Sequence, residues 1–513
     1  MASMVSVEKN SDRSKFEVDG GGAHDPDYAR KIEVFEEWLL AHGAKFPKLT
    51  MHSYDTEVRG VHATADIHED ETLVEVPLGC LITVEMGKAT DVGRAVLAAD
   101  LDMDAPKHVF LMLFMLVDRL DASSHFKAYY DILPPTLSNM PIFWNSEELA
   151  LLTGSYLLEQ IAERNQAIET DYRAICEVFP AFAEIASIDD FKWARMCVCS
   201  RNFGIVVDGL RTSAMVPYAD MLNHYRPRET KWSYEASKRA FTITSLQPIA
   251  SAAQVYDSYG QKCNHRFLLN YGFAIENNRE ADGFCPNEVP FKMSLEPSDE
   301  LHDAKQSLWI RDGNLCKMVR VCVSDNDNTA LALSCLRVMV ANREEFYNLM
   351  AMGASRTAPH TVKDIGFPIS LRNERAAMAV LLEMVDQKLA SYPTSLAEDR
   401  AALTDKANAP PFSNTRHALI QVAGEKEVLA HYRQHALVAL EMLGLPVGED
   451  ATYQAKLREL EVKGTSKWIL KYVSDDPRAP LGVCRRLERR KLQHTNLAGG
   501  QHTGCEGGGL GRR

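Results

Sequence analysis

Hydrophobic and polar positions change period several times along the chain, which divides it into helical and extended segments. Apolar residues at helical spacing predict one amphipathic helix over residues 28–42. Beyond it the period shortens to two, and short apolar runs bounded by turn residues predict strands. We expect strands at 61–63, 72–77 and 240–244, with 214–217 and 254–256 as neighbours of 240–244 in one small sheet.

Two long regions return to the helical period. Residues 88–199 are mostly helical by this criterion, and residues past 278 carry apolar stripes at i, i+3 and i+4 that predict a helical bundle. The region 88–199 is either an insertion between two halves of one domain or an independent helical domain. The predicted helices include 109–120, 147–162, 190–200, 329–350, 371–389 and 415–443.

Length and charge narrow the class of protein. At 513 residues and 57.4 kDa the chain is too long for one ordinary core, so we expect two or three domains. The net charge is −13, and no basic cluster stands out before the extreme C-terminus, which argues against capture of nucleic acid. A basic protein substrate remains compatible with this charge.

Cysteine usage and hydropathy indicate a soluble protein of a reducing compartment. The 11 cysteines are scattered, and the one close pair, Cys197 and Cys199, has poor spacing for zinc, so we expect reduced thiols and no metal. No apolar run approaches the roughly 20 residues that span a bilayer. Acidic residues near the N-terminus argue against a secretory or transit segment. We expect a monomer in the cytoplasm, with the nucleus as an alternative, and no membrane partner.

Candidate chemistry is concentrated between residues 215 and 278. The run Asp220-Met221-Leu222-Asn223-His224 follows an apolar stretch, and Tyr256-Asp257-Ser258-Tyr259-Gly260 is followed by Asn264 and by Tyr271-Gly272-Phe273. Both runs fall at predicted strand-to-loop junctions, where functional groups are commonly held.

This combination resembles the second half of a SET-domain methyltransferase, of the subgroup typified by the Rubisco large-subunit lysine methyltransferase and the actin-histidine methyltransferase. Further similarities, from about residue 30 to 443, lie in the first SET motif, the helical insertion and the C-terminal helices. The resemblance implies an α+β fold: a SET-domain β-sheet fold with a pseudoknot and a helical insertion, followed by an all-α helical substrate-binding domain.

The resemblance also implies domain boundaries. We expect a disordered N-terminus over 1–26, a SET domain over 27–280 with halves at 48–87 and 200–280 around the insertion 88–199, a helical Rubisco-methyltransferase-type domain over 281–490, and a disordered tail over 491–513.

Site residues follow from the family motifs, position by position. Tyr259 matches the catalytic tyrosine. The resemblance implies S-adenosylmethionine as cofactor and places these residues around it: Glu57, Val58, Arg59, Arg201, Asp220, Met221, Leu222, Asn223, His224 and Tyr259. It assigns the protein substrate to Phe203, Ala219, Tyr271 and Phe273, and implies no metal.

The chemistry suits such a site. Methyl transfer from a sulfonium to an amine needs alignment and a neutral nucleophile, and an apolar channel near a positive charge disfavours the ammonium form of lysine. The Tyr259 hydroxyl would align the methyl group at the transfer point.

The acceptor is predicted to be lysine. In the actin-histidine group the corresponding motifs read Arg-Gln-Asn and Trp-Asp-Met-x-Asn-His, whereas this chain has Phe203 and Ala219 at the final Asn and the Trp. An imidazole acceptor benefits from an amide that fixes its tautomer, and Phe203 has none. We therefore expect a protein-lysine methyltransferase acting on a non-histone protein. A histidine methyltransferase and a SET-derived peptide-binding protein without turnover are the alternatives.

Two departures from the family stand near the motifs. Ala252-Ala253-Gln254 replaces Gly-Glu-Gln before the catalytic strand, and His265-Arg266 replaces the Ala-Glu that often follows Asn264. Cys263 is a candidate reactive thiol, but the sequence shows no nearby histidine or carboxylate pattern that supports a cysteine nucleophile.

Overall fold

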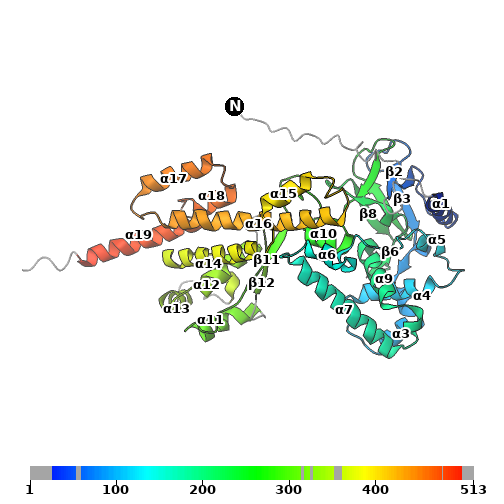
Figure 1. The fold of residues 1–513 in the computed structure, drawn as a ribbon, viewed down its shortest axis with the longest axis horizontal. Coiled ribbons are helices and arrows are strands. Elements are labelled where there is room, and N and C mark those ends of the chain that lie inside the picture. Colours follow the sequence, from blue (N-terminus) through cyan, green and yellow to red (C-terminus); the bar gives the residue numbers. More distant parts are fainter. Residues whose placement is uncertain are drawn as a thin grey trace, which may run out of the picture.

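A computed structural model of the chain describes residues 26–53, 59–312, 317–323, 327–351, 361–476 and 478–499. The strands β2, β3, β6 and β8 gather at one end of the molecule with α1, α4 and α7, and the helices α14, α16 and α19 extend towards the other end (Figure 1). None of the described helices is long and apolar enough to cross a membrane. The predicted disorder of residues 1–25 and 500–513 lies outside the described residues.

The N-terminal half contains three small sheets, and each joins strands from before and after the helical insertion. Their strand orders are β1-β2-β10-β7, β3-β9-β8 and β4-β6-β5. The strands are β1 Leu49–Ser53, β2 Arg59–Ala63, β3 Thr72–Pro77, β4 Ile82–Thr83, β5 Asn202–Val207, β6 Leu210–Met215, β7 Asn223–His224, β8 Thr230–Glu235, β9 Ala240–Ser245 and β10 Gln254–Asp257.

The predicted strands are present, but their predicted common sheet is wrong. The runs at 214–217, 240–244 and 254–256 correspond to β6, β9 and β10, which lie in three different sheets. Each pairs antiparallel with a strand of the N-terminal segment: β6 with β4, β9 with β3 and β10 with β2. Local periodicity identifies a strand but does not choose between partners that are distant in sequence.

Helices fill the insertion and cover the sheets. The expected helix at 147–162 is two helices, because the chain turns between Ala150 and Leu157 with Gly154 at φ +87°. The described α-helices of the N-terminal half are α1 Pro26–Ala41, α2 Val84–Ala89, α3 Asp91–Ala98, α4 Pro106–Asp118, α5 Lys127–Tyr130, α6 Ser146–Ala150, α7 Leu157–Val178, α8 Phe182–Ile185, α9 Ile188–Arg201 and α10 Asn264–Tyr271.

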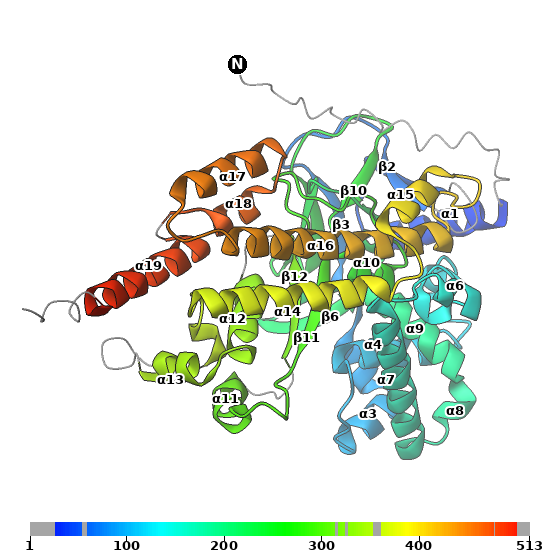
Figure 2. The same ribbon diagram turned by 60° about the vertical axis from the view of Figure 1, so that its left-hand side comes forward.

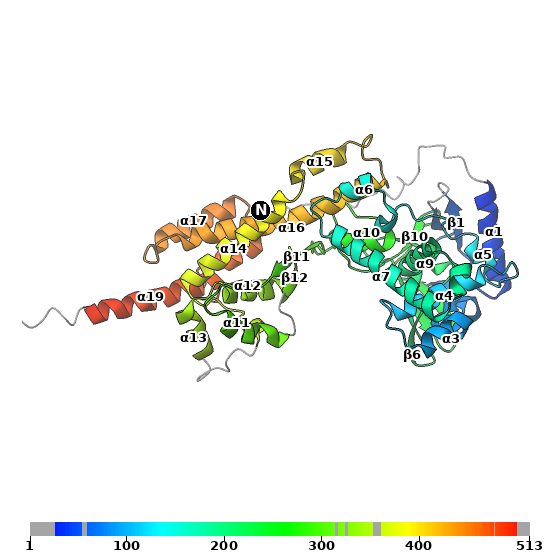
Figure 3. The ribbon, with the colours of Figure 1, turned by 60° about the horizontal axis from the view of Figure 1, so that its bottom comes forward.

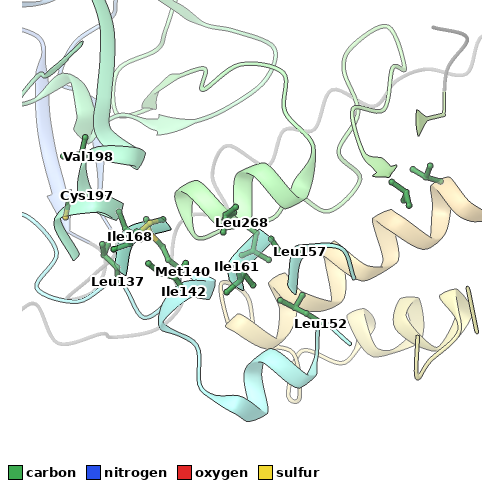
Figure 4. Close-up of a cluster of buried hydrophobic side chains, with 14 of the residues drawn as sticks. Leu137, Met140, Ile142, Leu152, Leu157, Ile161, Ile168, Cys197, Val198 and Leu268 are labelled. Atoms are coloured by element: carbon green, nitrogen blue, oxygen red, sulfur yellow. The ribbon is translucent and has the colours of Figure 1, made fainter. Parts of the chain in front are cut away.

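A buried apolar cluster joins the insertion to α10. Leu157, Ile161 and Ile168 of α7 are each at most 4% exposed, and Leu268 of α10 is fully buried. Figure 4 shows these side chains with those of Leu137, Met140, Ile142, Leu152, Cys197 and Val198 in one cluster. The insertion therefore shares a buried core with the helix that follows the Tyr259 motif.

The C-terminal half is predominantly helical, as expected, but it also contains a two-stranded antiparallel sheet that the all-α prediction missed. Its strands are β11 Glu288–Met293 and β12 Lys317–Cys322, and Pro290 inside β11 weakens the strand signal of the sequence there. The helices are α11 His302–Trp309, α12 Asp327–Met339, α13 Arg343–Ala351, α14 Leu371–Ala390, α15 Leu396–Thr404, α16 Asn414–Leu443, α17 Asp450–Val462, α18 Lys467–Val473 and α19 Pro480–Gly499.

Two boundaries in this half differ from the prediction. The expected helix at 329–350 is interrupted after Met339, because Asn342 caps a new helix by accepting a hydrogen bond from the Glu345 N–H at 2.9 Å. The expected domain end at 490 falls inside α19, which continues to Gly499.

The long helix α16 docks this half onto the N-terminal half. It lies beside α14 along much of its length (Figures 2 and 3) and packs its first half against α10. Within the interface, the buried Glu425 carboxylate accepts hydrogen bonds from Ser155 at 3.0 Å and from Tyr392 at 2.7 Å. Gly424 allows the close approach, since a Cβ there would lie 2.6 Å from Nδ2 of Asn287.

This close approach predicts that Gly424→Val destabilises the protein. The Asn287 amide cannot move aside freely, because its Oδ1 accepts hydrogen bonds from the backbone of Asn264 at 3.0 Å and from Asn278 at 2.9 Å. Overpacking of this kind costs about 1–3 kcal/mol, so the unfolding midpoint should fall in thermal and urea denaturation.

The matched control is Gly448→Val, since a Cβ at Gly448 meets no atom within 4 Å. Equal midpoints for the two variants would contradict close packing at Gly424.

Candidate functional site

Tyr259 is held at two points by the segment Leu222–His224, which we call the 222–224 segment. Strands β7 and β10 pair in parallel, with Asn223 opposite Tyr256 and His224 opposite Asp257. Just beyond this pair, the Tyr259 N–H donates to Nδ1 of His224 at 3.0 Å, and the Tyr259 hydroxyl donates to the Leu222 carbonyl at 2.9 Å. Backbone and hydroxyl of one tyrosine are thereby fixed to the same three residues.

The side chains of Tyr259 and His224 are both neutral at physiological pH. Burial raises the pKa of Tyr259 above its ordinary value, so its hydroxyl remains a donor. Burial, together with the nearby charges of Arg226 and Lys262, lowers the pKa of His224 to about 3. Because Nδ1 of the neutral imidazole accepts from Tyr259, the ring proton belongs on Nε2.

Aromatic rings surround Tyr259. Its ring centroid lies 4.8 Å from that of Tyr271 and 5.2 Å from that of His224. Phe273 stacks on Phe267 at 5.2 Å and tilts towards Tyr259 at 6.2 Å. Burial raises the pKa of Tyr271 to about 12, so this tyrosine is also neutral. The five rings define what we call the Tyr259 ring cluster: an apolar site with two uncharged hydroxyl groups, of which that of Tyr259 is fixed by the Leu222 carbonyl.

The helix α10 positions two of these rings. It ends at Gly272, whose φ of +77° turns the chain so that Tyr271 and Phe273 both approach Tyr259. A Cβ at Gly272 would lie 2.2 Å from Nδ2 of Asn139, so glycine is required there. At the start of α10, the amine of Lys262 donates to the Tyr259 carbonyl and lies 5.8 Å from the centre of the Tyr271 ring.

A second group of polar residues lies beneath the 222–224 segment. Nη1 of Arg201, at the end of α9, donates to the carbonyl of Asp220 at 3.1 Å and to its carboxylate at 3.2 Å. The hydroxyl of Tyr129 donates to the same carboxylate at 2.8 Å. Burial alone would lower the pKa of Arg201, but Asp220, Tyr129, Cys197 and Tyr259 together hold the pKa above its ordinary value.

This polar group retains unused bonding capacity. Nε of Arg201, Oδ1 of Asp220 and Nε2 of His224 are buried without a hydrogen-bond partner among the described residues. One charged donor and one charged acceptor left in this way match the carboxylate and the ammonium of an amino-acid group. Buried polar atoms without partners cost about 1–3 kcal/mol each, so a ligand that satisfies them gains affinity.

Asn223 and Arg59 have structural contacts. The Asn223 amide donates to the Arg59 carbonyl at 2.7 Å and to Oε1 of Gln254 at 2.9 Å, which ties β7 to β2 and β10. The Arg59 guanidinium donates to the Tyr28 hydroxyl at 2.5 Å and to the Ile132 carbonyl at 2.8 Å. Glu57 and Val58, expected beside Arg59, lie outside the described residues.

The structure therefore brings most of the sequence-predicted residues together in two adjoining groups, one around Tyr259 and one around Asp220. Phe203 belongs to a third group, since its ring packs on Phe241 at 4.9 Å and on Trp232 at 5.4 Å. Ala219 and Met221 are buried in the short 3-10 helix η4 Ala219–Met221, before the 222–224 segment.

Sequence reasoning missed several members of these groups. Tyr129 is 91 residues from the carboxylate that it contacts, and nothing local to it indicates that contact. Lys262 and Phe267 follow the recognised motif within eight positions of Tyr259. This closeness in sequence was the one indication that they could contribute to the site.

Known proteins share both halves of the chain. The Rubisco LSMT substrate-binding family matches residues 296–429. The actin-histidine N-methyltransferase of Mus musculus is 25% identical over 417 residues, which are 79% of this chain and 68% of that protein. The Homo sapiens protein of the same description is 25% identical over 463 residues, 88% of this chain and 75% of its own length.

Solved structures share the fold. The SET domain of LSMT bound to lysine and AdoHcy superposes with a TM-score of 0.68 at 21% identity, covering 86% of this chain and 97% of that one. Rubisco LSMT bound to AdoMet superposes with a TM-score of 0.67 at 22% identity, and the match covers 86% of this chain and 99% of that chain. The α+β SET-domain fold with a helical C-terminal domain is therefore confirmed.

The neutral state of His224 predicts a pH dependence of stability. The imidazole has a pKa of about 3 in the fold and about 6.5 in the unfolded chain, so between these values the unfolded state binds one more proton. This proton makes stability rise with pH by about 1.4 kcal/mol per unit between roughly pH 3 and 6.5. His224→Asn, which keeps an acceptor near Nδ1, should remove that part of the slope.

Urea unfolding at several pH values measures the slope. His68→Asn, at an exposed histidine, is the control and should keep the wild-type slope. An unchanged slope in His224→Asn would refute the assignment of a neutral acceptor.

Proposed function

The chain belongs to the SET-domain methyltransferase group that contains Rubisco LSMT and the actin-histidine N-methyltransferases, and we propose that it transfers a methyl group from S-adenosylmethionine to a lysine of a protein. The observation that carries the proposal is the fixed, uncharged Tyr259 hydroxyl inside a cluster of aromatic rings.

The unused polar atoms support this cofactor. Arg201 Nε suits the carboxylate of its amino-acid end and Asp220 Oδ1 the ammonium. The proposed binding residues are these two with Leu222, Asn223 and His224, and, by resemblance, Glu57, Val58, Arg59, Met221 and Tyr259. Because the Asn223 side chain already bridges three strands, this residue would contribute backbone groups. When bound, the sulfonium supplies an electrophilic methyl group that needs no metal.

Tyr259 has a positioning role at the reacting atoms. Its raised pKa leaves almost no phenolate at neutral pH, so proton removal from the acceptor is not assigned to it. Its hydroxyl is held by the Leu222 carbonyl and its backbone by His224, which fixes where the hydroxyl oxygen can stabilise a transferring methyl group. Such positioning can supply several kcal/mol of barrier reduction.

The ring cluster favours a lysine acceptor. Tyr271 and Phe273 offer aromatic faces to an aliphatic chain, and this apolar setting lowers the pKa of an entering amine so that it can react unprotonated. Lys262 contributes a positive charge near Tyr271 that acts in the same direction. Ala219 stands where the actin-histidine motif has tryptophan. Phe203 provides no amide, although its ring contacts are with Phe241 and Trp232.

The C-terminal helices are proposed to dock the protein substrate. The match to the Rubisco LSMT substrate-binding family covers residues 296–429, and α16 packs directly against α10, the helix that carries Tyr271. A protein bound along these helices would thus be tethered beside the ring cluster.

Histidine is the second candidate acceptor. The curated relatives at 25% identity are actin-histidine N-methyltransferases, and the neutral site would also accept an uncharged imidazole.

Methylation of paired peptides separates the two acceptors. Each pair comes from a substrate protein captured with deuterated methyl donor, and its members differ only by lysine or histidine at the labelled position. We expect label on the ε-amine of lysine, with the histidine peptide methylated at least tenfold more slowly. Fragment-ion mapping locates the label.

Label on an imidazole would overturn the lysine assignment. If the donor binds in calorimetry and no protein of the host extract is labelled, the chain is a binding protein without turnover, and the proposed activity is wrong.

A further inference from the structure

Three metal-binding side chains meet where α10 contacts β11. Sγ of Cys263 lies 3.3 Å from Nε2 of His265 and 3.7 Å from Oε1 of Glu288, and Nε2 lies 3.6 Å from Oε1. Cys263 and His265 are 4% and 3% exposed. The sequence shows no histidine or carboxylate pattern that supports Cys263 as a nucleophile, but the fold brings His265 and Glu288 into contact with it. Cys263 and His265 flank Asn264 at the start of α10, while Glu288 comes from a strand 25 positions away.

The separations of the three donor atoms fit one small divalent ion. In a tetrahedral zinc site, bonds of about 2.3 Å to sulfur and about 2.0–2.2 Å to nitrogen and oxygen give donor-to-donor distances of roughly 3.3–3.7 Å. The observed distances of 3.3, 3.6 and 3.7 Å lie in this range. An ion can therefore enter with little movement of the three side chains, at the cost of the thiol proton.

The surroundings favour a neutral complex. Thiolate and carboxylate together cancel the charge of a divalent ion, which is needed because Nε of Arg320 stands 3.7 Å from Glu288. The side chains of Asn287, Gln421 and Glu425 line the same small cavity.

We propose that Cys263, His265 and Glu288 form a Zn²⁺ site with one remaining coordination position towards this cavity. The ion would join the first turn of α10 to β11 and so connect the SET half with the C-terminal half. Since α10 presents Tyr271 to Tyr259, the ion would also stiffen the wall of the ring cluster. The site is independent of the proposed methyl transfer, because its ligands lie outside the ring cluster.

Cobalt substitution tests the site in the full-length protein without any activity assay. Metal-free protein is titrated with Co²⁺, which reports tetrahedral geometry by strong visible absorption and a thiolate ligand by a near-ultraviolet charge-transfer band. We expect one equivalent of Co²⁺ with both signals, and loss of both on addition of Zn²⁺.

Variants assign the ligands. Cys263→Ser should abolish the charge-transfer band, and His265→Ala and Glu288→Gln should each weaken Co²⁺ binding about 100-fold or more, since loss of an outer-shell contact alone costs 10–100-fold. Cys285→Ser, at another buried cysteine close to β11, is the matched control and should keep the wild-type spectrum. Circular dichroism of the metal-free proteins checks folding.

A wild-type protein that shows no charge-transfer band with Co²⁺ would overturn the proposal. The same holds if Cys285→Ser loses the band while Cys263→Ser keeps it. In either case the three side chains are only a hydrogen-bonded cluster.

Discussion

The attachment of Tyr259 to residues 222–224 is the constraint on which the candidate site depends. A single tyrosine donates its N–H to His224 and its hydroxyl to Leu222, so two motifs 35 and 37 positions apart act as one rigid unit. The unit works only if His224 stays neutral, which burial ensures. The buried Arg201–Asp220 pair supports the same segment from the other side, and the Tyr129 hydroxyl donates a hydrogen bond to the Asp220 carboxylate.

This rigid unit is connected to the rest of the molecule through α10. One end of α10 follows Tyr259 and is fixed by Asn264, whose amide both donates to and accepts from Ile275. The other end presents Tyr271, while the outer surface packs against α16. A substrate docked on the C-terminal helices would therefore meet a site whose aromatic wall belongs to the docking interface itself. Stability of the interface and geometry of the ring cluster should change together.

The sequence predicts the parts of this arrangement that are local. Tyr259 with Gly260, Asn223 with His224, and the main helices have recognisable motifs or periods, and most element boundaries lie within a few residues of expectation. Contacts between distant segments were not predictable: Tyr129 with Asp220, Glu288 with Cys263, and the assignment of β6, β9 and β10 to separate sheets. Phe203 shows the same limit, since its motif position was recognised but its packing on Trp232 and Phe241 was not.

Single-turnover methyl transfer by Tyr259→Phe tests the central claim most directly. The variant keeps the ring and its stacking on Tyr271 but loses the hydroxyl held by Leu222. The account predicts unchanged affinity for S-adenosylmethionine in calorimetry and a transfer rate lowered by about 100-fold or more, as for loss of one group that stabilises the transition state. Tyr225→Phe, at an exposed tyrosine beside the same motif, should keep the wild-type rate. A rate near wild type in Tyr259→Phe would contradict the assignment of this hydroxyl to the transfer point.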